Sequence, residues 1–347
     1  MSFLPLNPGT DFIVNSEAIT ATLWSGTVPT LATYFTSSTQ EASSAGNYYL
    51  NVYQTASSYT ISEVQFAIAY ANKQGSGSAL YNGAVGGNSF TRTLYGQYRT
   101  LVLGDENADF NFGGVTQSDF YVINVERARY KEKLFPGTFN LQLSGSGRTL
   151  ELTDDSKDIA SVSFNDAGRV FQIVSGSNGN AYTGGGGGVN SSGYTSVSGS
   201  YGYFLPDIGT IILNASALDM PAASGGIGLN TITASNGNTG VNNRKLFNHI
   251  SGAASFALNS EETISSNYAF IKVPNGEMNY SENPSFISSS TGEILYLNEG
   301  FNFNPRTYAT TVGLYNPNNE LLAVAKLSRP IPKDFTKELA IRIKLDF

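Results

Sequence analysis

The sequence predicts a mainly β protein, a multi-stranded antiparallel sandwich or barrel-like architecture with one to three short helices. Three observations lead to this fold class. Many short runs alternate apolar and polar residues, which is the period of a half-buried strand, and Leu339–Leu345 is a clear example. Turn residues such as Pro136-Gly137 and Asp166–Gly168 separate neighbouring runs. Few segments show the spacing of three and four that indicates a helix.

The expected strands follow one another along the chain. Phe3–Thr22 is an extended arm or a first strand, and Val28–Tyr53 contains aromatic-rich strands interrupted by a turn at Ser43–Gly46. Ile61–Ala71 is expected to be a strand, with a helix as the alternative. The further expected strands are Asp109–Phe112, Phe120–Val125, Thr138–Leu143, Thr149–Thr153, Ser161–Phe164, Val170–Val174, Gly209–Asn214, Tyr268–Val273 and Gly292–Leu297. Of these, Val170–Val174 and Gly209–Asn214 are apolar enough to be covered on both faces.

Two segments have the pattern of helices. In Phe90–Leu103, large apolar residues recur at intervals of three and four, and Gly104-Asp105 follows as a stop signal. Asn243–Ile250 is the second, shorter helix.

The C-terminal region predicts a hairpin followed by a strand. Thr310–Tyr315 and Glu320–Leu327 are separated by Asn316-Pro317-Asn318-Asn319, whose residues favour a tight turn. In Glu338–Phe347, the apolar residues Leu339, Ile341, Ile343 and Leu345 alternate with Arg342, Lys344 and Asp346, so one face should meet a core. Because chain ends usually fray, a strand maintained to Phe347 indicates that the terminus pairs within the subunit or across an interface. Phe347 is therefore a candidate partner contact.

Composition suggests four regions: an N-terminal arm (1–27), a β-rich region (28–175), a Gly/Ser-rich loop (176–202) and a second β-rich region (203–347). The two β-rich regions could also form one intertwined domain. The loop contains the run Gly184–Gly188 and should be flexible, or ordered only against a partner. A phosphate-binding loop would require Lys and Ser/Thr after the last glycine, but Val189-Asn190-Ser191 follows.

Charge and cysteine content limit the possible functions. Charged residues make up 14% of the chain, against about 25% in typical soluble domains. A surface of neutral polar residues and 12% aromatics suits a protein packed among neighbours, and equally a β protein with many Ser, Thr and Asn turns. The net charge of −7 gives no general nucleic-acid footprint. The absence of cysteine excludes disulfides and thiolate sites. Neither a secretory signal nor a run of about 18 apolar residues is visible, so we expect no membrane insertion.

Catalytic patterns are weak. The single histidine, His249, has no Asp or Glu within four positions and is expected to pack or form a hydrogen bond. The carboxylate pairs Asp154/Asp155, Asp105/Glu106 and Glu261/Glu262 are adjacent doublets, and neighbouring side chains of a strand point to opposite faces. Asp154, Asp155 and Asp158 could bind calcium, but Thr153-Asp154-Asp155-Ser156 more often forms an Asx turn. We therefore expect no enzyme activity, no catalytic residue, no metal site and no cofactor.

A basic run interrupts this acidic protein. Arg127, Arg129, Lys131 and Lys133 occupy every second position after the Phe120–Val125 strand. They point the same way if the strand continues and spread around the axis if the segment is helical. The run is either a solvated face or a docking strip for an acidic neighbour in an assembly.

Several segments resemble the virion structural proteins of contractile-tailed cyanophages and related marine phages. The resembling segments are Phe120–Asn124, Arg127–Leu134, Pro136–Leu141, Leu152–Ser156, Tyr203–Gly209 and, most strongly, Tyr308–Phe347 with Gly313-Leu314-Tyr315-Asn316 and Leu321–Leu327. The similarity extends over most of the chain and is weaker before about Val28 and in Gly184–Ser200. These segments are structural, so the resemblance brings no catalytic positions.

The resemblance implies a non-enzymatic structural subunit of a phage virion, located in the phage tail and assembled in the host cytoplasm. The tail baseplate is the favoured position, and the neck, sheath-associated or capsid-surface positions are alternatives. Its expected partners are other virion proteins and further copies of itself, as a homo-oligomer. A receptor-binding or glycan-cleaving tail-tip protein is the alternative from a different functional class.

Overall fold

The chain folds into two units, and changes in composition do not mark the boundaries between them. Unit 1 combines Met1–Ala18 with Thr263–Phe347, and unit 2 is Ile19–Glu262. Within them, the computed structural model describes residues 4–43, 48–77, 89–182, 188–233, 241–284, 286–288, 290 and 306–346. The composition-based boundaries at 27/28, 175/176 and 202/203 are not those of the units. Unit 1 takes residues from both chain ends, an arrangement that no local change of composition reveals.

Unit 2 is built on a long antiparallel sheet. The described strands follow the order β2-β16-β9-β10-β12-β14-β15-β7-β4-β3, with β11 and β13 also paired to β12. Their bounds are β2 (Thr30–Leu31), β3 (Leu50–Tyr53), β4 (Val64–Asn72), β7 (Asp119–Val125), β9 (Asn140–Gly145), β10 (Arg148–Asp154), β11 (Ser163–Asn165), β12 (Gly168–Ser177), β13 (Asn180–Ala181), β14 (Gly202–Leu205), β15 (Thr210–Asn214) and β16 (Phe256–Ala257). β5 (Phe110–Phe112) and β6 (Val115–Gln117) form a separate hairpin, and β8 (Lys133–Leu134) pairs with β17.

The central strands of this sheet are buried on both faces. Successive residues of β7 point to opposite sides, so Tyr121 and Ile123 belong to one core while Phe120 and Val122 belong to another. All five residues of β15 are buried. This confirms the prediction that Gly209–Asn214 is covered on both faces.

Helices cover the two faces of the sheet. α2 (Phe90–Leu103) contributes Leu94, Tyr95 and Val102 to one core. α4 (Val241–Ala253) contributes Leu246 and Ile250 to the other core. Ser89 caps the start of α2 and Gly104 ends it in a left-handed conformation, at the predicted bounds. The short helices α1 (Ser38–Ala42) and α3 (Ala215–Asp219) have five residues each and were not predicted.

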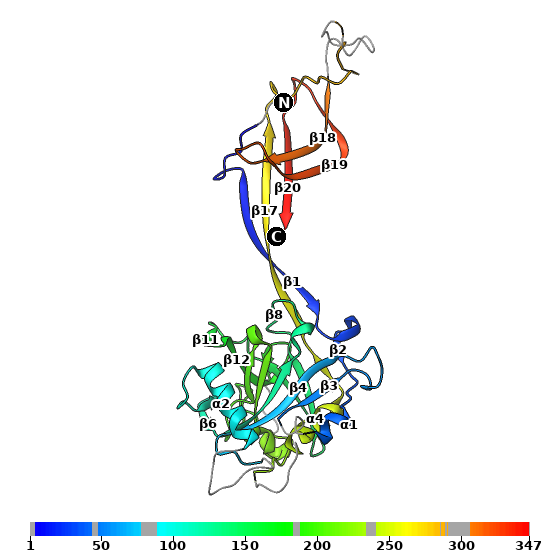
Figure 1. The fold of residues 1–347 in the computed structure, drawn as a ribbon. Coiled ribbons are helices and arrows are strands. Elements are labelled where there is room, and N and C mark those ends of the chain that lie inside the picture. The colour runs from blue at the N-terminus through cyan, green and yellow to red at the C-terminus, as the bar shows by residue number, and fades with distance from the viewer. Residues whose placement is uncertain are drawn as a thin grey trace. The chain divides into compact units, whose positions relative to one another are not determined.

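Unit 1 contains a three-stranded sheet and a two-stranded ribbon. β17 (Asn259–Val273) lies between β1 (Phe12–Thr22) and β20 (Leu339–Asp346), and only the parts of β1 and β17 outside Ile19–Glu262 belong to this unit (Figure 1). The ribbon consists of β18 (Thr307–Tyr315) and β19 (Leu321–Lys333). Asn319 adopts a positive φ of 63° in the predicted turn. β19 continues through Pro330 and Pro332, which an edge strand tolerates because its outer N–H groups need no partner.

The mainly β class is confirmed: strands dominate both units, and the described helices are few and short. Every expected strand that lies within the described residues is present, with shifted ends. The strand expected at Gly292–Leu297 lies outside the described residues, as does Phe347. Ile61–Ala71 contains the strand β4, so the helical alternative is wrong.

The Gly/Ser-rich segment differs from its prediction. Its described part from residue 188 to 202 packs within unit 2, where Thr195, Ser198 and Ser200 are buried. Gly199 approaches the β5–β6 hairpin closely: a Cβ on Gly199 would lie 1.9 Å from the Phe112 carbonyl oxygen. The expectation that this part orders only against a partner is wrong, because its glycines allow close backbone packing. Residues 183–187, which include most of the glycine run, lie outside the described residues.

Candidate assembly surfaces

The C-terminal strand directs its side chains as its alternation predicts. Ile341 and Ile343 are 7% and 6% exposed and pack with Ala269 and Ile271 of β17. Leu339 and Leu345 are partly buried against the same cluster, whereas Arg342, Lys344 and Asp346 are exposed. The ribbon covers this apolar face through four side chains, Val312, Leu314, Ala325 and Leu327.

The outer face of the ribbon carries large apolar side chains that are well exposed to solvent. Leu322 and Val324 are 68% and 59% exposed, and Leu321 and Tyr315 are 53% and 40% exposed. A Cβ on Gly313 would lie 2.9 Å from the Tyr315 ring and 3.2 Å from Leu321, so both side chains lean over that glycine. Tyr315, Leu321, Leu322 and Val324 together are called the ribbon patch below.

The ribbon patch is not among the predicted contacts, although the sequence carries a signal for it. Leu321–Ala325 is an unbroken apolar run, the pattern of a strand covered on both faces. In the single chain, Ala323 and Ala325 face inward while Leu322 and Val324 are exposed. The larger apolar groups of the run therefore lie on the uncovered side. Contiguous exposed apolar groups of this kind mark interaction sites.

The other face of the unit 1 sheet is polar and carries an electrostatic cluster. Lys344 Nζ lies 3.4 Å from a Glu17 carboxylate oxygen and 3.2 Å from Asp346. The Arg342 guanidinium and the Lys344 ammonium lie 5.5 and 6.0 Å from the centroid of the Tyr268 ring, within cation–π range. The hydrogen bond to Asp346 is the main cause that raises the pKa of Lys344. The Glu17 carboxylate thus comes from one outer strand of the sheet, β1, and the two cations come from the other, β20.

The basic run does not form a stripe. β7 ends at Val125, and Arg127–Arg129 form a short 3₁₀ turn, so the alternative in which the strand continues through the run is wrong. Arg127 donates to the backbone oxygens of Tyr130 and Lys131 and lies over the Tyr130 ring, 4.7 Å from its centroid. Lys131 and Lys133 form ion pairs with Glu262 and Glu132, at 3.1 and 3.6 Å. The local geometry thus gives each residue an intramolecular role, and a partner contact by any of them stays a prediction.

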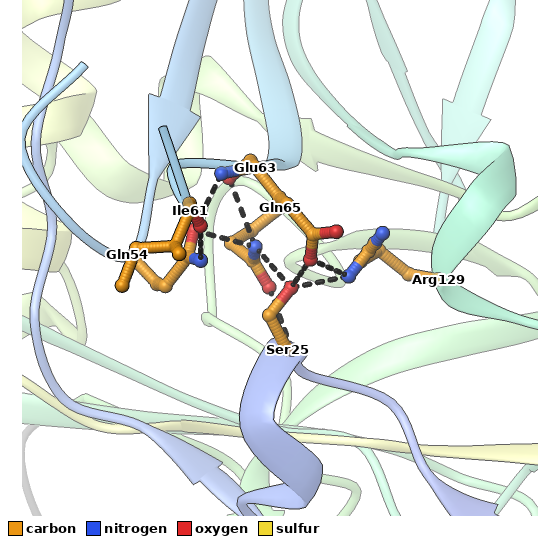
Figure 2. A network of polar contacts seen from close by, with 6 residues as sticks. All are labelled: Ser25, Gln54, Ile61, Glu63, Gln65 and Arg129. Atoms are coloured by element: carbon orange, nitrogen blue, oxygen red, sulfur yellow. Dashed lines mark hydrogen bonds and ion pairs between the residues drawn. The ribbon is translucent and has the colours of Figure 1, made fainter. Parts of the chain in front are cut away.

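Arg129 belongs to a polar network that holds three segments of unit 2 together (Figure 2). Its guanidinium donates to Glu63 at 2.6 Å and also to the Ser25 hydroxyl. The Ser25 hydroxyl donates to Glu63 at 2.5 Å and accepts from the buried Gln65 amide at 2.8 Å. The hydrogen bonds from Ser25 and Arg129 lower the pKa of Glu63. Ser25, Glu63, Gln65 and Arg129 are called the Arg129 network below.

The acidic doublet at the end of β10, Asp154 and Asp155, performs a structural role. The Asp154 carboxylate is fully buried and accepts the backbone N–H groups of Gly137 and Ser156, so the predicted Asx turn is present. Asp155 accepts the backbone N–H of Gln172 at 3.0 Å, and burial raises its pKa to about 6. Burial also raises the pKa of Asp154. In the described part of the chain, no group of three His, Asp or Glu side chains is arranged to hold a metal ion.

His249 also behaves as the sequence indicated. Its Nδ1 lies 2.6 Å from the backbone oxygen of Ser144, which joins α4 to β9. A shallow hollow elsewhere in unit 2 is lined by Glu151, Gly176, Ser177, Asn178, Asn180, Ala181 and Tyr182. It contains one carboxylate, that of Glu151, whereas glycoside hydrolysis needs a pair.

Comparisons with known proteins add no relative. No protein-family model matches the chain, and no curated protein and no solved structure matches it either. None of the described helices is both long and apolar enough to span a bilayer.

Proposed function

We propose that this chain is a non-enzymatic structural subunit of a phage virion, positioned in the baseplate of a contractile tail. The observation that carries the proposal is the ribbon patch. Four apolar side chains of the ribbon are 40–68% exposed on the face opposite the unit 1 core. Burial of such groups by a neighbour gains roughly 25 cal/mol for each Å² removed from water.

The low charge content supports the same proposal. With 14% charged residues, the surface has few groups whose desolvation would oppose close packing. The sequence resemblance to virion structural proteins of cyanophages supplies the virion and tail as the expected location. Other virion proteins and further copies of this chain are the proposed partners.

The glycan-cleaving alternative gains no support from the acidic doublet at the end of β10. Asp154 is fully buried, Asp155 is 7% exposed, and both carboxylates accept backbone N–H groups. A general acid and its partner must reach the bond that is cleaved.

The assembly proposal is tested by sedimentation velocity of the purified full-length chain and of a Val324→Lys variant. The wild-type chain should form oligomers, and the variant should dissociate because it places a charge in a buried contact. Val197→Lys is the matched control, since Val197 is 66% exposed and lies in unit 2. A wild-type chain that stays monomeric at every concentration, also in mixtures with other tail proteins, would contradict the proposal. Localisation in a reconstruction of the intact particle tests the baseplate position.

A further inference from the structure

Within the described residues, both edges of the unit 1 sheet are open. Among the described strands, β1 and β20 each pair with β17, and neither has a partner on its other side. β20 runs antiparallel to β17 over eight paired positions, from Val273↔Leu339 to Ser266↔Asp346. An edge of this length presents a row of backbone N–H and C=O groups on which another chain can pair.

β1 is open on more than its edge. Ile13 and Val14 are neighbours in the strand, so their side chains point to opposite faces of the sheet. They are 53% and 69% exposed. Neither face of β1 is therefore covered at this point, and a strand in this state gains from a neighbour on its free side.

The charges of the two edges are complementary. Between Phe12 and Ala18, Glu17 is the only charged residue of β1. β20 carries Arg342 and Lys344 and one acid, Asp346. The contact between Lys344 and Glu17 shows that the anion of one edge and the cations of the other lie on the same face of the sheet.

We infer that β20 of one subunit pairs with β1 of a second copy of this chain, so that the sheets of successive subunits join edge to edge. This inference rests on the proposed function and names one of its interfaces. Joining the edges in this way places Arg342 and Lys344 beside the next subunit's β1, whose only charge in this part is negative. Pairing β1 with β1 would bring two Glu17 carboxylates together and leave Arg342 and Lys344 of both β20 strands at the free edges.

The pairing is heterologous, since the two strands that meet are different. Repeated around an axis, it closes a ring in which no edge of this sheet is left unpaired. The ribbon patch is separate from these edges and stays available to other virion proteins.

The absence of cysteine makes the pairing testable by thiol cross-linking. One chain carries Asn15→Cys and a second, distinguishably tagged chain carries Ala340→Cys, at two exposed positions of β1 and β20. The two chains are co-expressed, treated with a short bis-maleimide and analysed by mass. Each chain has a single thiol, so no cross-link within one chain can form. A chain with Val197→Cys replaces the Ala340→Cys chain as the control, and Ala18→Cys serves as a second β1 position.

The expected result is a product that joins the β1 thiol of one chain to the β20 thiol of the other, with none from the control pair. Products that join only β1 to β1, or only β20 to β20, would overturn the inference in favour of a two-fold interface. Oligomers in sedimentation with no cross-link from either β1 position would overturn it while leaving the proposed function standing. A chain that sediments as a monomer in every mixture would remove both.

Discussion

Lys344 Nζ lies 3.4 Å from a carboxylate oxygen of Glu17, although 327 positions separate the two residues in sequence. Their contact joins the two outer strands of the unit 1 sheet, one from each end of the chain. Both partners are exposed, so the ion pair itself adds little stability. Its importance is topological, because unit 1 exists only when the two chain ends fold together.

Truncation after Asp334 should therefore destroy unit 1. The truncated chain lacks β20, whose Leu339, Ile341, Ile343 and Leu345 face the apolar cluster under the ribbon. Each of these side chains contributes roughly 1.5–3 kcal/mol when fully buried. We expect insoluble protein, or soluble protein that fails to assemble, as measured by the soluble fraction and by calorimetry. Soluble truncated protein with the melting transition of the full chain would contradict this expectation.

A substitution at Gly199 should lower the free energy of unfolding far more than a substitution at a glycine with the same backbone conformation. Gly199 and Gly147 have φ values of +74° and +72°, so both strain an alanine similarly. A Cβ at Gly199 would lie 1.9 Å from the Phe112 carbonyl oxygen, whereas nothing lies within 4 Å of a Cβ at Gly147. We expect Gly147→Ala to cost about 1 kcal/mol and Gly199→Ala several kcal/mol in urea unfolding. Equal losses would mean that residues 188–202 do not pack on the β5–β6 hairpin.

Most elements of this fold were accessible from local pattern. The helix Phe90–Leu103 follows from its spacing and from its Ser89 and Gly104 caps, and the turn Asn316–Asn319 follows from its residue types. Local pattern did not reveal that both ends of the chain form unit 1, because such pairing depends on contacts between residues hundreds of positions apart. It also misjudged residues 188–202, since a glycine that permits close packing looks the same in sequence as one in a flexible loop.

The candidate surfaces divide in a similar way. The inward face of β20 was predicted from alternation. A basic stripe was one of two alternatives for the basic run, because the sequence does not show that β7 ends at Val125 and that a 3₁₀ turn follows. The ribbon patch was overlooked because an apolar run predicts burial without saying whether the cover belongs to the same chain.

Loss of Arg129 should destabilise unit 2 rather than only change its surface charge. Its guanidinium donates to Ser25 and Glu63, and its side chain is 15% exposed. We expect Arg129→Ala to lower the free energy of unfolding by roughly 1–3 kcal/mol, because hydrogen bonds to charged groups contribute this much. The matched control is Lys131→Ala: its ion pair with Glu262 is 70% exposed at the lysine, and its loss should fall within about 0.5 kcal/mol.

Because Arg129 is largely buried and Lys131 is exposed, only Lys131 is suited to a test of docking by the basic run. Charge reversal at Arg129 would break the Arg129 network and confuse a folding defect with an assembly defect. Lys131→Glu changes a well-exposed charge, so its effect on incorporation into particles reports on docking. A subunit with normal melting and lower incorporation would support a contact with an acidic neighbour. Normal incorporation at physiological salt would leave this residue as part of a solvated face.

Asp155 should make unit 2 less stable as pH rises from about 4 to about 6. Its pKa in the folded chain is raised to about 6 by burial, from a usual value of 3.8. Between these values the folded chain holds a proton that the unfolded chain has released, so stability falls as pH rises through the window and levels off above it. The difference between the pKa values of the folded and unfolded chain corresponds to a loss of roughly 3 kcal/mol in the free energy of unfolding at most.

Asp155→Asn should remove the loss of stability between about pH 4 and about pH 6. The amide carries no charge, and its oxygen can still accept the Gln172 N–H. We expect the variant to be more stable than wild type at pH 7 and similar to it near pH 4, in urea unfolding at several pH values. Asp109→Asn is the contrast, because its hydrogen bond from Lys73 lowers the pKa of Asp109. Removing that carboxylate should destabilise the chain at pH 7, and the effect should vanish as pH falls through the lowered pKa. Parallel pH profiles for wild type and Asp155→Asn would show that this carboxyl does not titrate differently in the folded chain.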